Sequence, residues 1–332
     1  MKPKVSVAMC TFNGERFLRQ QLESIAGQER PPDELVVCDD GSYDATLEIL
    51  QEFASRARFP VRLVRNEKNL GSTKNFEKVI SLCDGDLIAL CDQDDVWEPN
   101  KLACLSDVLV SDNSLGGVFS DAELIDADAT RMGKRIWELH KFRFARPDDF
   151  GRDSAVRLLL KHDVLTGATL MIRACVRESI LPIPELWVHD GWIAWMLVLY
   201  SRLTFVPEPL LRYRLHENQQ LGIGRIGVGQ TRERRRANYC REDRSKLRAM
   251  CLQFEALRAR WISRPGENFA VYRELIDNKI TSLRRRSELP RQCLPRAYSI
   301  LCSFYSYQEY ARGLSTMRGD LFLPSISEGQ KG

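Results

Sequence analysis

Leu87-Ile-Ala-Leu-Cys-Asp-Gln-Asp-Asp95 joins a short apolar run to a dense cluster of carboxylates. Residues 87–91 are typical of a buried strand, and the acidic cluster follows where that strand must end. Neighbouring carboxylates repel one another unless water, protons or a cation compensate their charge. Because alternate residues of an extended chain point to the same side, Asp92 and Asp94 can face one space. We therefore expect either a Mg²⁺ or Mn²⁺ site, since both cations suit oxygen ligands, or a solvated acidic turn.

Similar apolar runs precede this stretch at residues 5–9, 35–38 and 61–64, and helical spacing of apolar residues separates them. Such an alternation of strands and helices predicts right-handed crossovers and an α/β fold with a mostly parallel sheet flanked by helices. Ligands of these sheets bind beyond the carboxyl ends of the strands. The polar residues that follow the strands should therefore meet at one crevice.

Two of these strand ends carry further candidate side chains. Thr11 and Asn13 follow the first strand, and Asp39 and Asp40 follow the second. A carboxylate there can accept the ring N–H of a uracil or thymine base, but the sequence Asp-Gly-Ser also suits an Asx turn, and we expect one of the pair to have only that role. Lys74, at the start of a predicted helix, is either a phosphate contact or an exposed surface lysine.

Two later polar residues are candidates for chemistry. Asp190 opens an aromatic-rich helix, where its carboxylate can either deprotonate a hydroxyl or cap the helix. His216 lies just after a predicted strand and is a candidate metal ligand, although a lone histidine is more often structural. Both readings of each residue remain open at this point.

The composition is that of an ordinary globular protein. The chain has 332 residues, with 44% hydrophobic and 28% charged residues. It contains no apolar stretch of the ~20 residues that a membrane helix needs and no signal-peptide pattern, so we expect a cytoplasmic protein. The ten cysteines are scattered without a Cys-x-x-Cys pair, and we expect buried thiols rather than disulfides or a metal centre.

The composition changes along the chain, and arginine becomes frequent in residues 232–260. We place a boundary after residue 228, which divides the chain into residues 1–228 and a basic helical extension, residues 229–332. The Arg-rich segment is either a solvated helix face or a contact with an anionic partner, and we expect a peripheral membrane contact rather than nucleic acid. The apolar pattern of residues 301–310 could serve an interface in a homo-oligomer.

The order of the motifs resembles that of a known family. Residues 5–14 (VSVAMCTFNG), 39–44 (DDGSYD), 69–75 (NLGSTKN) and 92–102 (DQDDVWEPNKL) resemble the inverting family 2 glycosyltransferases of the GT-A fold. Three later motifs resemble the rhamnosyltransferase-like branch of that family: residues 166–168 (TGA), 189–192 (HDGW) and 213–218 (YRLHEN). The resemblance covers residues 4–222.

The resemblance implies a role for each matching position. Asp190 is implied as the catalytic base, and Asp94 and His216 as the metal ligands, with Asp95 as a second possible register for Asp94. We expect His189 and Trp192 to contact the acceptor, although at least two of the tryptophans in this helix region should lie in the core. The positions expected to bind the nucleotide-sugar are Thr11, Asn13, Asp39, Asp40, Lys74, Asp92, Thr166 and Gly167.

The activity implied by the resemblance is inverting, Mg²⁺- or Mn²⁺-dependent transfer of a sugar from a nucleoside diphosphate. We expect rhamnose from dTDP-rhamnose as the donor sugar, a glycan or lipid-linked glycan as the acceptor, and a place in cell-surface polysaccharide synthesis on the inner face of the membrane. One alternative is a UDP-hexose donor. Another is a nucleic-acid- or membrane-binding protein led by the Arg-rich segment. A nucleotidyltransferase is disfavoured, since the loop after the first strand lacks its basic glycine-rich pattern.

Overall fold

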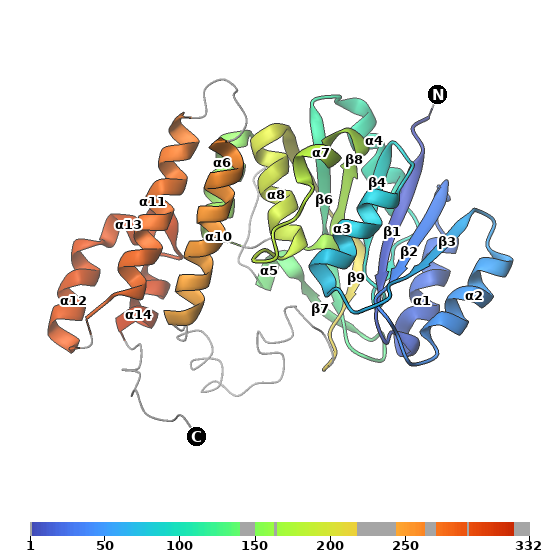
Figure 1. Ribbon diagram of the computed structural model, residues 1–332, viewed down its shortest axis with the longest axis horizontal. Coiled ribbons are helices and arrows are strands. Elements are labelled where there is room, and N and C mark those ends of the chain that lie inside the picture. Colours follow the sequence, from blue (N-terminus) through green and yellow to red (C-terminus); the bar gives the residue numbers. More distant parts are fainter. Residues whose placement is uncertain are drawn as a thin grey trace. The chain divides into compact units, whose positions relative to one another are not determined.

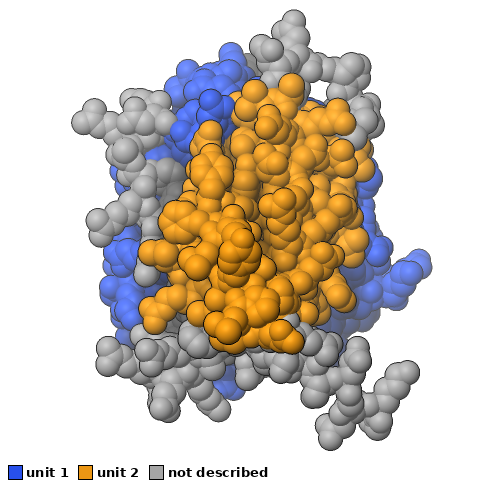
Figure 2. Space-filling view, turned by 90° about the vertical axis from the view of Figure 1, so that its left-hand side faces the viewer, with its two compact units in different colours: residues 1–155, 163–223 blue, residues 156–162, 224–332 orange. Residues whose placement is uncertain are grey.

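The computed structural model divides the chain into two compact units (Figures 1 and 2). One comprises residues 1–155 and 163–223, and the other comprises residues 156–162 and 224–332. The residues that the structure describes are 2–139, 150–162, 165–217, 244–262, 270–290 and 292–321. The predicted boundary after residue 228 lies outside the described residues and stays a prediction.

The first half of the sheet is parallel, as the sequence predicts. Its strands run in the spatial order β3-β2-β1-β4 (Figure 1). Their bounds are β1 Val5–Thr11, β2 Glu34–Asp39, β3 Val61–Arg65 and β4 Leu87–Cys91. Thr11 pairs with Asp39, and Met9 pairs with Cys91. The carboxyl ends of β1, β2 and β4 therefore lie side by side, and their polar extensions begin at one edge of the sheet.

Helices cover both faces of this half-sheet. They are α1 Glu15–Ala26, α2 Thr46–Arg56 and α3 Ser72–Leu82. Right-handed crossovers place α1 and α2 on one face, while α3, whose connection runs back across β2 and β1, lies on the other (Figure 1). In α1, for example, Phe17, Leu18, Leu22 and Ile25 form a buried stripe at helical spacing.

The second half of the sheet is mixed rather than parallel. β8 (Leu170–Arg173) lies antiparallel between β4 and β6 (Leu115–Ile125), and β9 (Arg202–Arg214) is parallel to β6. Two short antiparallel strands are attached, β5 Val96–Trp97 to β9 and β7 Arg131–Arg135 to β6. Proline at 207 and 209 predicts a broken strand, but a register shift opposite residues 120 and 121 accommodates both prolines within β9.

Further helices are described within residues 101–200. They are α4 Lys101–Ser111, α5 Ile136–Leu139, α6 Arg152–Lys161, α7 Arg177–Ile180 and α8 His189–Tyr200, with 3₁₀ turns η2 Gly167–Thr169 and η3 Ala174–Val176. Nine of the twelve residues of α8 are buried. This helix contacts both α3 and β9, which explains why its sequence is apolar on every side.

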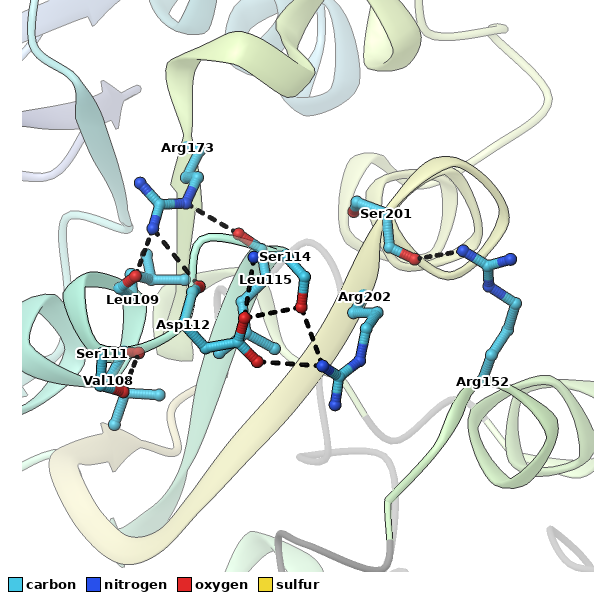
Figure 3. Close-up of polar contacts among 10 residues, drawn as sticks. All are labelled: Val108, Leu109, Ser111, Asp112, Ser114, Leu115, Arg152, Arg173, Ser201 and Arg202. Carbon is cyan, nitrogen blue, oxygen red and sulfur yellow. Dashed lines mark hydrogen bonds and ion pairs between the residues drawn. The ribbon is translucent and has the colours of Figure 1, made fainter.

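Arginine side chains hold the amino ends of β6 and β9, at the sheet edge opposite the carboxyl end of β4 (Figure 3). Arg173 donates from Nε to the carbonyl of Leu115 at 2.8 Å. Arg202 donates to Asp112 Oδ2 at 2.9 Å and to Ser114 Oγ at 2.8 Å. The turn that follows α4 is therefore held in place by the side chains of Arg173 and Arg202. These contacts lie at the opposite end of the sheet from the polar residues that follow β1, β2 and β4.

The described part of the second unit, beyond residue 243, is helical. Its helices are α10 Arg244–Ile262, α11 Ala270–Ser287, α12 Cys293–Cys302, α13 Phe304–Tyr310 and α14 Leu314–Leu321. A small core joins α12, α13 and α14 and consists of Leu289, Ile300, Tyr307, Ala311 and Met317. Beside it, Arg286 and Asp320 form a buried ion pair at 2.8 Å.

Two expectations from composition can be compared with the structure. Among the described helices, none is long and apolar enough to cross a membrane. Five cysteines are buried thiols, as expected: Cys10, Cys38, Cys83, Cys91 and Cys251. Cys175, Cys293 and Cys302 are exposed, so the expectation of burial is wrong for these three.

Candidate active site

The carboxylate of Asp39, at the end of β2, is saturated by groups of the chain itself. Its Oδ2 accepts hydrogen bonds from Thr11 Oγ1 at 2.9 Å and Ser42 Oγ at 2.5 Å. Its Oδ1 accepts from the backbone N–H groups of Ser42 at 2.9 Å and Gly41 at 3.2 Å. A carboxylate offers about four acceptor positions, and all are in use here. Asp39 is therefore the member of the pair that builds the Asx turn.

Asp40 holds the loop that follows β3. Its Oδ1 accepts from Asn66 Nδ2 at 2.7 Å and from Leu70 N at 2.8 Å, and its Oδ2 accepts from Gly71 N at 2.9 Å. One acceptor position remains. A cavity of about 460 Å³ adjoins this carboxylate. The residues that line it are Asp40, Gly41, Arg65, Asn66, Glu67, Lys68 and Asn69. A cavity of this size at the strand ends suits a small planar ligand group.

Gln93 ties the end of β4 to the end of β1, which residue type alone does not reveal. Its Oε1 accepts from Phe12 N at 2.8 Å, and its Nε2 donates to Phe12 O at 3.0 Å. A Cβ on Gly14 would lie 2.3 Å from Gln93 Oε1, so a larger residue there would displace the Gln93 side chain from these two bonds. Asn13, which has φ of 48°, accepts from Tyr43 N at 3.1 Å. Asn13, which was expected to bind the nucleotide-sugar, thus connects two loops in this structure.

The acidic cluster after β4 differs from these satisfied groups. Asp95 is 1% exposed, its Oδ1 accepts from Arg214 N at 3.0 Å, and its Oδ2 has no hydrogen-bond partner among the described residues. Burial raises the pKa of Asp95 well above its usual value, and the charges of Asp94 and Asp92 add to this effect. Burial, followed by the charges of Asp94 and Asp190, raises the pKa of Asp92 to about 7. Negative charge at this strand end is therefore poorly compensated.

Lys101 supplies a buried positive charge beside the cluster. Its ammonium donates to the carbonyl of Ala168 at 2.5 Å and lies 3.7 Å from the centre of the Trp97 ring. Burial lowers the pKa of Lys101 to about 7, against the opposing influence of nearby Asp92 and Asp95. The sequence offers a signal for this residue, since Lys101 falls inside the motif 92–102, but periodicity cannot show that its side chain is buried.

Asp94 and His216 are brought together from β4 and β9. Asp94 Oδ2 lies 2.8 Å from His216 Nε2, and both side chains are largely buried. The imidazole ring packs against Phe17, with 4.7 Å between ring centres. Among the described residues, no group of three or more histidine, cysteine or acidic side chains has metal-binding geometry. A pair of one oxygen and one nitrogen ligand still fits a Mg²⁺ or Mn²⁺ ion that shares a substrate diphosphate, because such ions need only one or two side chains.

Arg214 is a buried residue of the site that the sequence analysis misses. Its Nε donates to the carbonyl of Asp94 at 2.7 Å, and its terminal nitrogens reach Gln20 Oε1 at 2.5 Å and Ala127 O at 3.0 Å. Its guanidinium also stacks on Phe17, 4.7 Å from the ring centre. Arg214 therefore fixes the backbone of Asp94 against α1 and β6. The alternation of apolar and polar residues along a strand does not predict that an arginine within it is buried.

Asp190 lies in the first turn of α8, close enough to Asp92 for their charges to interact. Its Oδ1 accepts from Gly191 N at 2.7 Å. Burial raises the pKa of Asp190 to about 6, although the N–H groups of Gly191 and Gly167 act in the opposite direction. The charge of Asp190 in turn contributes to the raised pKa of Asp92. The pKa of Tyr213 on β9 is raised by burial, and the charges of the same four carboxylates add to this effect.

The predicted acceptor residues lie in the core instead. Trp192 is fully buried, and its indole N–H donates to the carbonyl of Ile180 at 2.7 Å. His189 is 5% exposed and stacks on Phe76 with 3.9 Å between ring centres. Burial lowers the pKa of His189 to about 3, so the ring is neutral. A Cβ on Gly167 would lie 2.6 Å from the His189 ring. Both acceptor assignments are therefore corrected to structural roles.

Three further residues that were expected to bind the nucleotide-sugar, Lys74, Thr166 and Gly167, have structural contacts within the chain. Lys74 donates to Glu77 Oε2 at 2.9 Å and to the carbonyl of Ile183 at 2.7 Å. The charge of the ammonium is therefore neutralised by Glu77 on the same helix, so the structure does not present Lys74 as a phosphate ligand. The carbonyl of Thr166 accepts from Thr169 N at 2.9 Å, and this closes the turn η2. Thr166 and Gly167 thus shape the backbone next to Asp190.

Curated relatives match about two thirds of the chain. An uncharacterized protein of Mycobacterium tuberculosis is 36% identical over 214 residues, which cover 64% of this chain and 59% of that protein. TuaG of Bacillus subtilis, which carries the name of a teichuronic acid biosynthesis glycosyltransferase, is 27% identical over 221 residues, or 65% of this chain and 81% of that protein. The chain thus spans less than two thirds of the length of the mycobacterial relative.

Solved structures share the fold. S. aureus TarS 1–349 in complex with UDP-GlcNAc has a TM-score of 0.58 at 15% identity and covers 92% of this chain and 81% of that one. The mannosyltransferase PcManGT from Pyrobaculum calidifontis, in complex with GDP-Man and Mn²⁺, has a TM-score of 0.56 at 15% identity and covers 91% of this chain and 75% of that one. The predicted GT-A architecture is therefore confirmed. The family model of glycosyl transferase family 2 matches residues 6–172, and the chain accordingly belongs to glycosyl transferase family 2.

Proposed function

We propose that the chain is an inverting glycosyltransferase that takes a sugar from a nucleoside diphosphate with the help of Mg²⁺ or Mn²⁺. The observation that carries this proposal is the carboxylate cluster at the end of β4 of a family 2 fold, where Asp95 Oδ2 is buried without a hydrogen-bond partner among the described residues and Lys101 compensates the negative charge only in part. Buried carboxylates without compensating charge favour a cation. Asp190 and His216 lie beyond the region matched by the family model, so their roles rest on geometry and resemblance.

The base of the donor would occupy the cavity at the ends of β2 and β3. Asp40, which borders that cavity and retains one acceptor position, is better suited than the saturated Asp39 to accept a ring N–H of uracil or thymine. Thr11 and Asp39 would then shape the turn beneath the base. Asp92 would accept hydrogen bonds from the ribose or lie beside the diphosphate.

The cation would bind at Asp94 and His216. The Asp94 carboxylate lies beside the imidazole and is 17% exposed, whereas Asp95 is 1% exposed and accepts from the backbone of Arg214, so we favour Asp94 as the metal ligand. When bound, the cation supplies positive charge to the departing nucleoside diphosphate. Arg214 would hold the Asp94 backbone in place for this contact.

Asp190 would act as the general base. It removes the proton of the acceptor hydroxyl, the oxygen forms a bond to the anomeric carbon from the face opposite the diphosphate, and the bond to the diphosphate breaks with inversion. Its pKa of about 6 leaves the carboxylate ionised at neutral pH while making it a stronger base than an exposed aspartate. The N–H groups of Gly191 and Gly167 orient it.

The finer assignments rest on resemblance. We propose rhamnose from dTDP-rhamnose as the donor sugar and a glycan or lipid-linked glycan as the acceptor, in cell-surface polysaccharide synthesis. A UDP-hexose is the alternative donor, and it is supported by the structural neighbour that holds UDP-GlcNAc.

A donor screen tests the proposal. The protein is incubated with Mn²⁺ or Mg²⁺ and a panel of dTDP-, UDP- and GDP-sugars, with and without glycan acceptors, and released nucleoside diphosphate is measured. We expect release from one donor class that chelation of the cation abolishes. Turnover that is unaffected by chelation would contradict the metal assignment, and no release from any donor would contradict the activity itself.

A further inference from the structure

Helix α12 presents large apolar side chains to solvent. Leu294, Tyr298 and Leu301 are 84%, 72% and 67% exposed. Their spacing of four and three residues places them on one face of the helix. The opposite face is also covered, because Ile300 joins the core of the second unit and Arg296 is buried. The outward stripe is therefore additional to the apolar face that holds α12 in its own fold.

The exposed apolar surface continues beyond α12. Phe304 and Tyr305, at the start of α13, are 48% and 74% exposed, and Leu314 at the start of α14 is 64% exposed. Isolated exposed apolar residues are ordinary, but a run of this kind along consecutive helices marks an interaction surface. We call the residues Leu294, Tyr298, Leu301, Phe304 and Tyr305 the apolar stripe.

The charges around the stripe distinguish between partners. Within residues 292–321 the acids are Glu309, which pairs with Arg157 at 3.0 Å, and Asp320, which is buried against Arg286. The exposed charged residues of the same segment are Arg312 and Arg318. The segment therefore shows solvent a surface that is apolar, aromatic and cationic, with its carboxylates already compensated.

We propose that the apolar stripe docks peripherally into the surface of an anionic lipid bilayer. Leucine side chains would enter the acyl boundary, the tyrosine rings suit the headgroup level, and the arginines suit anionic lipids. The inference goes beyond the proposed function, and it moves the predicted membrane contact away from the Arg-rich segment. Residues 232–241 of that segment lie outside the described residues, and the described helices α10 and α11 compensate part of their charge internally, since Arg258 pairs with Asp277 and Arg284 with Glu255.

Vesicle sedimentation tests this inference without any donor sugar, so that its failure is distinct from failure of the proposed activity. The full chain is mixed with vesicles of phosphatidylcholine alone or with added phosphatidylglycerol. We expect binding to the anionic vesicles and a loss of at least about tenfold in Leu301→Glu, because a leucine that would enter the acyl boundary is replaced by a charge. Arg312→Gln combined with Arg318→Gln should weaken binding several-fold, and more strongly at low salt.

The matched control is Val110→Glu, which places the same charge on an exposed apolar position of α4, in the other unit. It should bind vesicles like the unaltered chain. Circular dichroism and thermal unfolding establish whether each variant is folded. If Leu301→Glu does not fold, Tyr298→Glu takes its place as the variant of the apolar stripe. Absence of vesicle binding by the unaltered chain would overturn the inference. So would a stable dimer that ignores vesicles and dissociates in Leu301→Glu, since the stripe would then contact a second copy.

Discussion

The ends of β2 and β4 both carry carboxylates, yet the two regions treat them in opposite ways. At the end of β2, Asp39 accepts four hydrogen bonds and Asp40 accepts three, all from neighbouring groups of the chain. At the end of β4, Asp92 and Asp95 have strongly raised pKa values, and Asp95 retains a buried oxygen without a hydrogen-bond partner among the described residues. The carboxylates after β2 have their hydrogen-bond partners within the folded chain. The carboxylates after β4 do not have enough positive charge near them to balance their own.

This difference separates structural from functional acids better than their number or spacing does. A hydrogen-bonded carboxylate stabilises its loop, whereas a desolvated and mutually repelling set destabilises the fold and is favoured only where a ligand compensates it. Lys101 offsets part of the charge at β4, but its own pKa is lowered to about 7 by burial, so the compensation is incomplete.

The largest expected effect is on the rate of transfer and concerns Asp190. Asp190→Asn should lower the rate of transfer by roughly 10²–10⁴-fold, because the amide cannot accept the acceptor proton. Donor binding should change little, since Asp190 is placed at the acceptor side. Steady-state kinetics and nucleotide calorimetry measure the two quantities, with the exposed Asp107→Asn on α4 as the control. Unimpaired turnover would remove Asp190 from the mechanism.

At the end of β2 the expected effect is on stability. Asp39→Ala removes a buried acceptor and leaves Thr11, Ser42 and the turn N–H groups without their partner, so unfolding should become easier by about 3 kcal/mol. Chemical denaturation measures the change. The metal dependence of any residual activity should be preserved. A fully stable variant would show that the turn does not depend on this carboxylate.

The pH dependence of the reaction reports on Asp190. Because its pKa is raised to about 6, the base is protonated below that pH and ionised above it. The rate should therefore fall about tenfold for each pH unit below 6 and approach a plateau above it. The rate at saturating donor and acceptor, measured between pH 4.5 and 8, tests this. A profile that is flat through pH 6 would point to another base.

The smallest expected effect is again on stability, but here the substitution should stabilise the fold, whereas Asp39→Ala should destabilise it. Asp92→Asn removes a half-buried charge near Asp94 and Asp190, so the cation-free protein should gain ~1 kcal/mol of stability at pH 8. The sign follows from the raised pKa: the native state binds more protons than the unfolded state between pH 4 and 7, and stability falls as pH rises through that window. Thermal unfolding with a chelator present measures the gain. A loss of stability would contradict the contrast between the two strand ends.

The sequence predicts the parallel half of the fold well, because each of β1, β2 and β4 is an apolar run closed by turn residues. It also predicts which loops meet, since parallel strands share one end. The mixed half is harder: the bulge that accommodates Pro207 within β9 depends on pairing with β6, a contact between residues about ninety positions apart. Alternation of apolar residues carries no information about such pairing.

The candidate site could be predicted as a place but not as a set of contacts. Asp92 and Asp94 follow β4, and the charge of Asp190, in the first turn of α8, acts on Asp92. The roles of the other residues depend on burial. Trp192 lies in the core, and the buried Arg214 donates a hydrogen bond to the backbone carbonyl of Asp94. Residue type alone cannot distinguish a buried side chain from an exposed one in an apolar helix or strand.

Calorimetric titration of nucleoside diphosphates into the protein tests the central claim most directly. The unaltered chain should bind UDP or dTDP in the presence of Mn²⁺ and bind it more weakly after chelation, since Asp94 and His216 would hold the cation against the diphosphate. Asp94→Asn should lose the dependence on Mn²⁺ while remaining folded. Equal Mn²⁺-dependent affinity in Asp94→Asn and the unaltered chain would contradict the account.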